Sequence, residues 1–186
     1  MFVEAVASVQ QTMIRLSRHL DTVDIPYAVI GGMAVGLHGA RSFCYDLGIL
    51  LTSDGLNRFR EECVSELYEP VRDRSRRFVD RQSRVPIEVF LTGHCPGRVG
   101  PKPITFPDPG MASEEIGKIR VVSLPQLIQL KLAAGAYYDL GEVVLLIRHC
   151  QLNEAFLAKL HPLVHGDFLA CLDEMRREDD FDTCED

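Results

Sequence analysis

The hydrophobic positions of the chain change their spacing near residue 26. In residues 3–22, Val, Met and Leu side chains recur every three or four residues, which is typical of an amphipathic helix. Asp24 to Pro26 interrupts this pattern, and residues 27–31 then form a short apolar run that stops at a glycine pair. The pattern therefore predicts a helix followed by a short strand.

The rest of the chain is organised around residues 27–52. After the first apolar run come Gly31 and Gly32, a short helix-like segment, and a second apolar run at 49–51. This order predicts a strand, a tight turn, a short helix and a second strand. Paired glycines let backbone N–H groups approach a ligand, and the turn opens a helix N-terminus, where anions bind. Asp46 lies where the second strand begins, and its carboxylate could hold Mg²⁺ against bound phosphates.

The middle of the chain predicts one helix and one hairpin. Residues 53–67 have a helical hydrophobic face, and Ser53 or Asp54 can cap its N-terminus. Residues 78–81 and 85–91 have the pattern of two strands joined by a tight turn.

The last part of the chain predicts a loop, a short strand and several helices. Residues 92–109 are rich in Gly and Pro, and a loop of this length often forms the rim or lid of a site. A strand-like run at 119–122 follows, and Ser123 then caps a helical segment. Two further short helices are expected at 151–161 and 165–175.

The composition is that of an ordinary globular protein. Hydrophobic residues make up 46% of the 186 residues and charged residues 25%. No apolar run approaches the ~20 residues that span a bilayer. The N-terminus has an early Glu4 and lacks the basic start of a signal peptide. We therefore expect a cytoplasmic protein with no membrane partner.

The six cysteines are scattered and show no Cys-x-x-Cys spacing. In a chain of this size without a signal peptide, this distribution favours free thiols. Two His-Cys pairs, at 94–95 and 149–150, do not favour a zinc site, because adjacent residues rarely converge on one ion.

The net charge of −7 argues against a protein that coats nucleic acid with its whole surface. It also disfavours a helix-turn-helix regulator, which needs a basic recognition helix. Positive charge is nevertheless concentrated, since six arginines lie between residues 72 and 84, whereas residues 173–186 are acidic. The arginines could form a local face for phosphates, or only a solvated approach to the hairpin.

Two blocks of the sequence follow a known family pattern. The first is the strand that ends at Gly31 and Gly32, followed about a dozen residues later by Asp46, where the family has Asp-hydrophobic-Asp. The second block carries these matching residues: Val122, Ser123, Leu124, Leu127, Lys131, Leu132, Ala134, Gly135, Asp139, Leu140, Val143 and Leu146. The chain thus resembles the nucleotidyltransferase fold of the polymerase-beta type, and more closely the small bacterial proteins related to AbiEii-type toxins.

This resemblance implies a magnesium-dependent transferase. A hydroxyl would attack the α-phosphate of a nucleoside triphosphate, take the nucleoside monophosphate and release pyrophosphate. The acceptor could be tRNA, another protein or a small molecule, and a toxin-related protein could have an antitoxin partner. Asp46 and Glu88 would be catalytic and bind Mg²⁺. The residues that would contact the nucleotide are Gly31, Gly32, Arg41, Lys131 and Asp139.

Three of these residues also have a plainer interpretation. Glu88 lies in an alternating strand and could point to water. Lys131 could be a snorkelling lysine at a helix edge. Asp139 could simply cap the helix that follows it.

Gly48 is the main departure from the family pattern. Residues i and i+2 of a strand point the same way, so Asp-x-Asp delivers two carboxylates, whereas Asp46-Leu47-Gly48 delivers one. Cys44 also replaces the usual Thr or Ser. Three explanations remain open: a natural pseudoenzyme, an engineered inactive copy of a toxic enzyme, or a rearranged site with another carboxylate. The alternative function is a catalytically inactive nucleotide-binding or protein-interaction module on the same fold.

Pattern and resemblance together predict an α/β (α+β) fold, with a small mixed sheet flanked by helices. We expect a nucleotidyltransferase-like core at residues 1–122. A helical C-terminal part, residues 123–186, should pack on the core and end in an acidic tail. The expected strands lie near residues 27–31, 46–52, 78–81 and 85–91.

Overall fold

The computed structural model describes residues 2–64, 67–97 and 103–183 of the chain. In this part the helices are α1 (Phe2–Thr22), α2 (Gly32–Leu37), α3 (Ser53–Glu62), α4 (Pro109–Ala112), α5 (Leu124–Ala134), α6 (Tyr137–His149) and α7 (His165–Thr183). Two short 3₁₀ helices, η1 (Glu154–Lys159) and η2 (Pro162–Val164), precede α7. The strands are β1 (Ala28–Ile30), β2 (Leu47–Leu51), β3 (Tyr68–Pro70), β4 (Arg77–Asp80), β5 (Pro86–Leu91), β6 (Ser113–Ile116) and β7 (Ile119–Val122).

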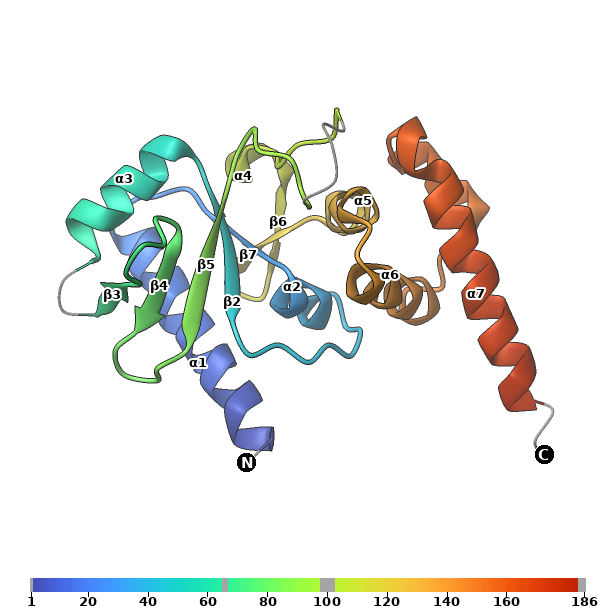
Figure 1. Ribbon diagram of the computed structural model, residues 1–186, viewed down its shortest axis with the longest axis horizontal. Helices are drawn as coiled ribbons and strands as arrows, with labels where there is room; N and C mark the ends of the chain where they lie inside the picture. Colours follow the sequence, from blue (N-terminus) through green and yellow to red (C-terminus); the bar gives the residue numbers. More distant parts are fainter. Residues whose placement is uncertain (1, 65–66, 98–102, 184–186) are drawn as a thin grey trace.

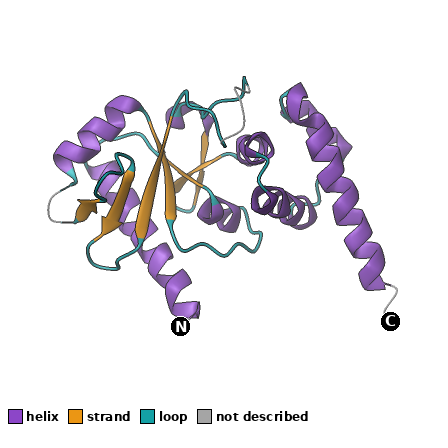
Figure 2. Ribbon diagram, viewed as in Figure 1, coloured by secondary structure: helices purple, strands orange, loops and turns teal. Residues whose placement is uncertain are grey.

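The strands form one mixed sheet in the order β3-β4-β5-β2-β1-β7-β6. Two neighbouring pairs are parallel, β2 with β5 and β1 with β7, and the other pairs are antiparallel. In Figure 1, α1 runs behind the strands, whereas α2, α5 and α6 lie to one side and α7 is outermost. The architecture is therefore a helix-flanked mixed sheet, as predicted, and Figure 2 shows how helices dominate the chain after β7.

The central strands form where the sequence has continuous apolar runs. All three residues of β1 and all five of β2 are buried, as expected for strands covered on both faces. On α1, the residues Val9, Met13, Leu16 and Leu20 form the buried stripe, which explains the helical spacing of the sequence. The hydrophobic pattern therefore predicted the centre of the molecule correctly.

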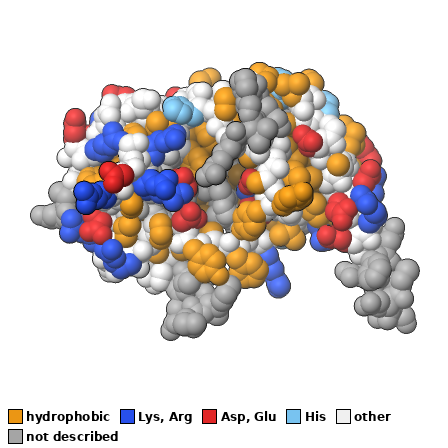
Figure 3. All heavy atoms as spheres, in the orientation of Figure 1, with side chains coloured by type: hydrophobic (Ala, Val, Ile, Leu, Met, Phe, Trp, Pro, Cys, Tyr) orange, Lys and Arg blue, Asp and Glu red, His pale blue; other side chains and the backbone are white. Residues whose placement is uncertain are grey.

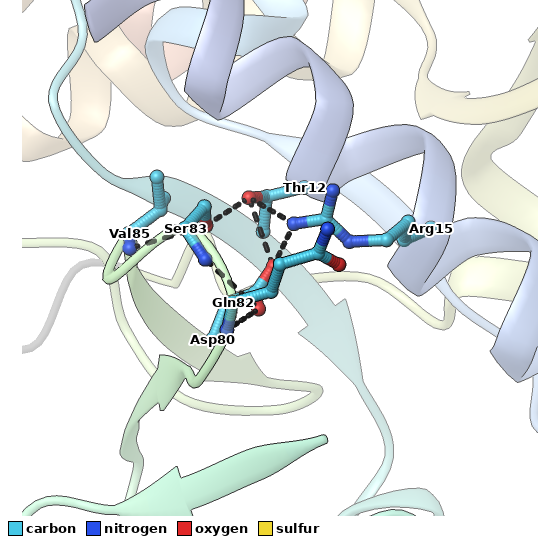
Figure 4. A network of polar contacts seen from close by, with 6 residues as sticks. All are labelled: Thr12, Arg15, Asp80, Gln82, Ser83 and Val85. Carbon is cyan, nitrogen blue, oxygen red and sulfur yellow. Dashed lines mark hydrogen bonds and ion pairs between the residues drawn. The ribbon is translucent and has the colours of Figure 1, made fainter.

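Asp80, at the end of β4, fastens the hairpin between β4 and β5 to α1 (Figure 4). Its carboxylate accepts a hydrogen bond from the Thr12 hydroxyl (3.0 Å) and pairs with Arg15, both on α1. It also accepts the Gln82 N–H of the turn (2.9 Å). Burial alone would raise the pKa of Asp80, but these contacts together hold it below its ordinary value.

Several boundaries differ from the sequence-based expectation. The helix expected at 53–67 ends at Glu62, and its N-cap is Thr52, whose side chain accepts the Gly55 N–H (2.9 Å). Residues 65–66 of that expected helix lie outside the described ranges. The segment 151–161 contains the 3₁₀ helix η1 instead of an α-helix, and the helix expected at 165–175 continues to Thr183. The strands β3 and β6, one at each edge of the sheet, were not predicted.

No disulfide joins the five cysteines that lie within the described ranges. None of the described helices combines the length and the apolar character needed to cross a membrane.

Candidate functional site

A cleft of about 500 Å³ opens where β1 ends and β2 and β5 begin. Its lining includes Gly32, Asp46, Arg77 and Glu88, with aromatic side chains at its rim. We call it the Asp46 cleft.

The strand pairing explains why these residues meet. β2 and β5 run parallel, with Gly48 opposite Glu88, so both strands begin at the same end of the sheet. β1 is antiparallel to β2, with Ile30 opposite Gly48, so it ends there. The turn after β1, the entry to β2 and the start of β5 therefore share one edge.

Asp46 and Glu88 act on each other electrostatically. Partial burial of its carboxyl group raises the pKa of Asp46, and the negative charge of Glu88 raises it further, whereas Arg77 opposes the shift. Glu88 is half-buried and forms an ion pair with Arg77 (3.2 Å), which lies opposite it in the hairpin. The cleft thus holds two neighbouring carboxylates and one arginine.

Within the described ranges, Asp46 and Glu88 are the only carboxylates that line this cleft. Across the part of the chain that the structure describes, no group of three or more His, Cys, Asp or Glu side chains gathers as metal ligands do. Two carboxylates suffice for one Mg²⁺ that takes its other ligands from water and phosphate. A two-metal site, in contrast, needs further carboxylates that these residues do not provide.

Gly48 is closely packed between the backbone of β1 and the side chain of Phe90. A Cβ atom at this position would lie 2.7 Å from the carbonyl oxygen of Ile30 and 3.2 Å from the ring of Phe90. The strands β1 and β2 are therefore packed for a glycine, and an aspartate could enter only if β1 shifted.

The glycine pair serves conformation and packing. Gly31 has φ +78°, a region that residues with a Cβ rarely adopt. A Cβ on Gly32 would lie 2.9 Å from both the Cys44 Cβ and the Ser42 Oγ, so the absence of a side chain there lets the following loop close over α2. The helix that follows, α2, is only six residues long.

Lys131 is buried in an ion-pair cluster. Its ammonium group donates to Asp139 (3.0 Å) and to Glu142, both on α6. Glu142 in turn accepts a hydrogen bond from the Ser42 hydroxyl in the loop between α2 and β2. Lys131 does not snorkel to solvent, and Asp139 does not cap α6, whose N-cap is Ala136. Asp139 lies instead in the first turn, where its negative charge also favours the helix dipole.

A second cavity of about 500 Å³ is lined by Gly31, Lys131 and Asp139. It lies next to the Asp46 cleft, because Gly31 is adjacent to Gly32 in the chain. Its other walls are mainly apolar and include Phe90 of β5 and Phe106 of the Gly- and Pro-rich loop. That loop therefore contributes a cavity wall. Its residues 98–102 lie outside the described ranges.

The structure divides the expected site residues into three groups. Gly32, Asp46 and Glu88 share the Asp46 cleft, whereas Gly31, Lys131 and Asp139 share the second cavity. Arg41 is exposed in the loop after α2 and lines neither cavity.

Sequence reasoning included Arg77 only in the cluster of six arginines, without assigning it to this site, and it missed the aromatic rim. The rim consists of Phe43, Tyr45 and Tyr138, all exposed, and the Tyr138 hydroxyl donates to the Phe43 carbonyl oxygen (2.9 Å). Figure 3 shows hydrophobic side chains along the lower edge of the molecule, the edge at which β2 begins in Figure 1. The hairpin register could have revealed Arg77, because it places that residue opposite Glu88.

The chain is similar in fold to solved nucleotidyltransferase-like structures. An antigenic nucleotidyltransferase-like protein from Paracoccidioides brasiliensis superimposes with a TM-score of 0.57 at 16% identity, covering 94% of this chain and 91% of that one. JHP933 from Helicobacter pylori gives a TM-score of 0.51 at 17% identity, covering 84% of this chain and 72% of that one. No protein-family model and no curated protein sequence matches the chain.

These similarities define a class of fold. The mixed sheet with flanking helices, together with the structures that it resembles, shows that the chain has the nucleotidyltransferase-like fold.

Proposed function

We propose that this protein binds a nucleoside triphosphate with one Mg²⁺ in the Asp46 cleft, and that it does not transfer the nucleotidyl group at an enzymatic rate. The observation that carries the proposal is that Asp46 and Glu88, which come from different parts of the chain, line one cleft on a nucleotidyltransferase-like fold.

The pair of carboxylates supports binding of a single cation. Mg²⁺ is commonly held by one or two carboxylates together with phosphate oxygens and water. Burial and, after it, the charge of Glu88 raise the pKa of Asp46, and a cation between the two carboxylates would relieve their repulsion. Once bound, Mg²⁺ would neutralise charge on the triphosphate. Arg77 would exchange its contact with Glu88 for a phosphate oxygen.

The aromatic rim supports a nucleoside as the remainder of the ligand. Phe43, Tyr45 and Tyr138 are exposed around the cleft, and stacking of a base on an aromatic side chain contributes about 1–3 kcal/mol. The volume of about 500 Å³ is in the range of small-molecule sites.

Gly48 argues against efficient transfer. The two-metal reaction requires carboxylates that bridge the ions, and the position that supplies one in the family pattern has no side chain here. The contact with the Ile30 carbonyl makes this glycine part of the strand packing. The cleft therefore supports binding better than catalysis.

The test combines binding with turnover. Binding of ATP, GTP, CTP and UTP would be measured by calorimetry, and pyrophosphate release would be followed in the same samples with Mg²⁺. The proposal expects binding of at least one nucleotide without pyrophosphate release. If none of the four binds, the proposal is wrong. If release is seen and is lost in Asp46→Asn, the protein is instead an active nucleotidyltransferase.

A further inference from the structure

A hollow of about 420 Å³ lies between α3 and the chain segments next to β4 and β5. Six polar or charged residues line it, and we call it the arginine hollow: Ser53, Asn57, Arg60, Ser75, Arg76 and His94. None of the described residues that line it is Asp or Glu. This distinguishes it from the Asp46 cleft, which contains two carboxylates.

The two arginines of the hollow have no carboxylate partner among the residues that the structure describes. Other arginines nearby are paired, for example Arg77 with Glu88 (3.2 Å) and Arg58 with Glu62 (2.9 Å). Among the described residues, no carboxylate lies within 4.0 Å of the guanidinium nitrogens of Arg60 or Arg76. Figure 3 shows Lys and Arg side chains gathered over the half of the molecule that contains β3, β4 and β5. The hollow is thus a local positive site on a protein of net charge −7.

The lining side chains start from fixed backbone positions. Arg60 belongs to α3, and its guanidinium donates to the Ser75 carbonyl oxygen. The Arg76 carbonyl oxygen accepts the Val89 N–H of β5 (2.8 Å). The His94 N–H closes a turn at the end of β5 (3.1 Å). Little backbone ordering is therefore needed to bring the three groups to one ligand.

The chemistry of the lining selects for a phosphate group. A guanidinium presents several N–H donors in a plane, which matches phosphate oxygens better than a point charge does. Ser53 adds a hydroxyl at the N-terminus of α3, a helix of ten residues whose positive end favours an anion. We propose that the arginine hollow is a phosphate-binding site that takes either the backbone of a polynucleotide or a phosphorylated small molecule.

This site is separate from the proposed nucleotide cleft. Arg76 and Arg77 are consecutive, but Arg76 lines the hollow and Arg77 lines the Asp46 cleft. Loss of nucleotide binding in Asp46→Asn would therefore leave phosphate binding in the hollow intact, and the two proposals can fail independently.

The test uses two probes and two variants of equal charge. A fluorescently labelled ten-nucleotide single-stranded RNA is titrated by anisotropy, and inorganic pyrophosphate is titrated by calorimetry without Mg²⁺. The test variant is Arg60→Gln with Arg76→Gln. The control is Arg72→Gln with Arg177→Gln, two exposed arginines outside the hollow. Thermal melting establishes that both variants are folded, and His94→Gln gives a second, independent variant of the hollow.

The expected result is that at least one probe binds the natural sequence and that its affinity falls about tenfold or more in the test variant, because two charge-assisted contacts are lost. The control should change it by less than about threefold. Binding of the RNA with a steep salt dependence identifies a polynucleotide ligand, and binding of pyrophosphate alone identifies a phosphorylated small molecule. The proposal is overturned if neither probe binds, or if the test and control variants weaken binding equally.

Discussion

Replacement of Gly48 by alanine should destabilise the protein, although alanine is normally the better strand residue. The added Cβ would lie 2.7 Å from the Ile30 carbonyl oxygen, which is backbone and can move only with β1. Overpacking of this kind costs about 1–3 kcal/mol. Alanine loses less backbone entropy on folding than glycine does, and this difference offsets about 0.5–1 kcal/mol of the cost. Because the contact of 2.7 Å is with backbone, the overpacking cost should lie near the upper end of its range, and the expected net loss is about 1–2 kcal/mol.

Urea denaturation measures this loss. For an m-value of about 2 kcal/mol/M, the midpoint should fall by about 0.5–1 M in Gly48→Ala with the slope unchanged. Gly48→Asp should lose more, because its carboxylate would also lie near Asp46 and Glu88. This confounds any attempt to restore activity by that substitution alone.

A second glycine provides the control. Gly141 lies inside α6, where nothing lies within 4 Å of an added Cβ, so Gly141→Ala should stabilise the protein by about 0.5–1 kcal/mol. If Gly48→Ala is as stable as the natural sequence, the close contact between β1 and β2 is not as described and the steric argument is refuted.

Further predictions concern buried and titratable groups. Lys131→Met should destabilise the protein by about 3–5 kcal/mol in thermal melts, because two carboxylates, one of them buried, lose their partner. The pKa of Asp80 is lowered in the folded protein, so its contribution to stability is complete above about pH 4 and is lost as the pH falls through the folded pKa. In urea melts, Asp80→Asn should therefore be less stable than the natural sequence at pH 7, and its free energy of unfolding should change less between about pH 4 and 2. Burial and nearby carboxylates raise the pKa of both Cys44 and Cys171 to about 11, so peptide mapping after brief alkylation at pH 8 should find them unmodified while the exposed Cys95 is labelled. Rapid modification of Cys44 in folded protein would contradict the described burial.

The sequence predicted the centre of the fold because burial leaves a local signal there. The apolar runs at 27–31 and 46–52 correspond to β1 and β2, which are buried on both faces. The edge strands leave no such signal. β3 is three residues that include Pro70, and β6 has two exposed glutamates among its four residues. Their strand character comes from the neighbours β4 and β7, which a local pattern cannot show.

The candidate site was predictable only in part, because its residues come together through pairing and packing of distant segments. The family resemblance named Asp46 and Glu88 together, but it did not give the direction of their strands; the structure shows that they meet because β2 and β5 are parallel neighbours. The partners of Lys131 lie on the next helix, and no spacing rule singles out Glu142 as one of them. The enclosure of Gly48 depends on the approach of the Ile30 carbonyl and has no sequence signature.

The most direct test of the proposed function is the Mg²⁺ dependence of nucleotide binding. The affinity of the tightest-binding nucleoside triphosphate would be measured by calorimetry with Mg²⁺ and with EDTA. The same pair of measurements would be made for Asp46→Asn with Glu88→Gln, and for the control Glu115→Gln, an exposed carboxylate on β6. The raised pKa of Asp46 means that the folded protein disfavours its ionised form. Replacement by the neutral Asn should therefore not unfold the protein. The account predicts that Mg²⁺ strengthens binding at least tenfold in the natural sequence and in the control, and that the double variant loses this gain. An equal Mg²⁺ effect in all three proteins, or none in the natural sequence, would contradict it.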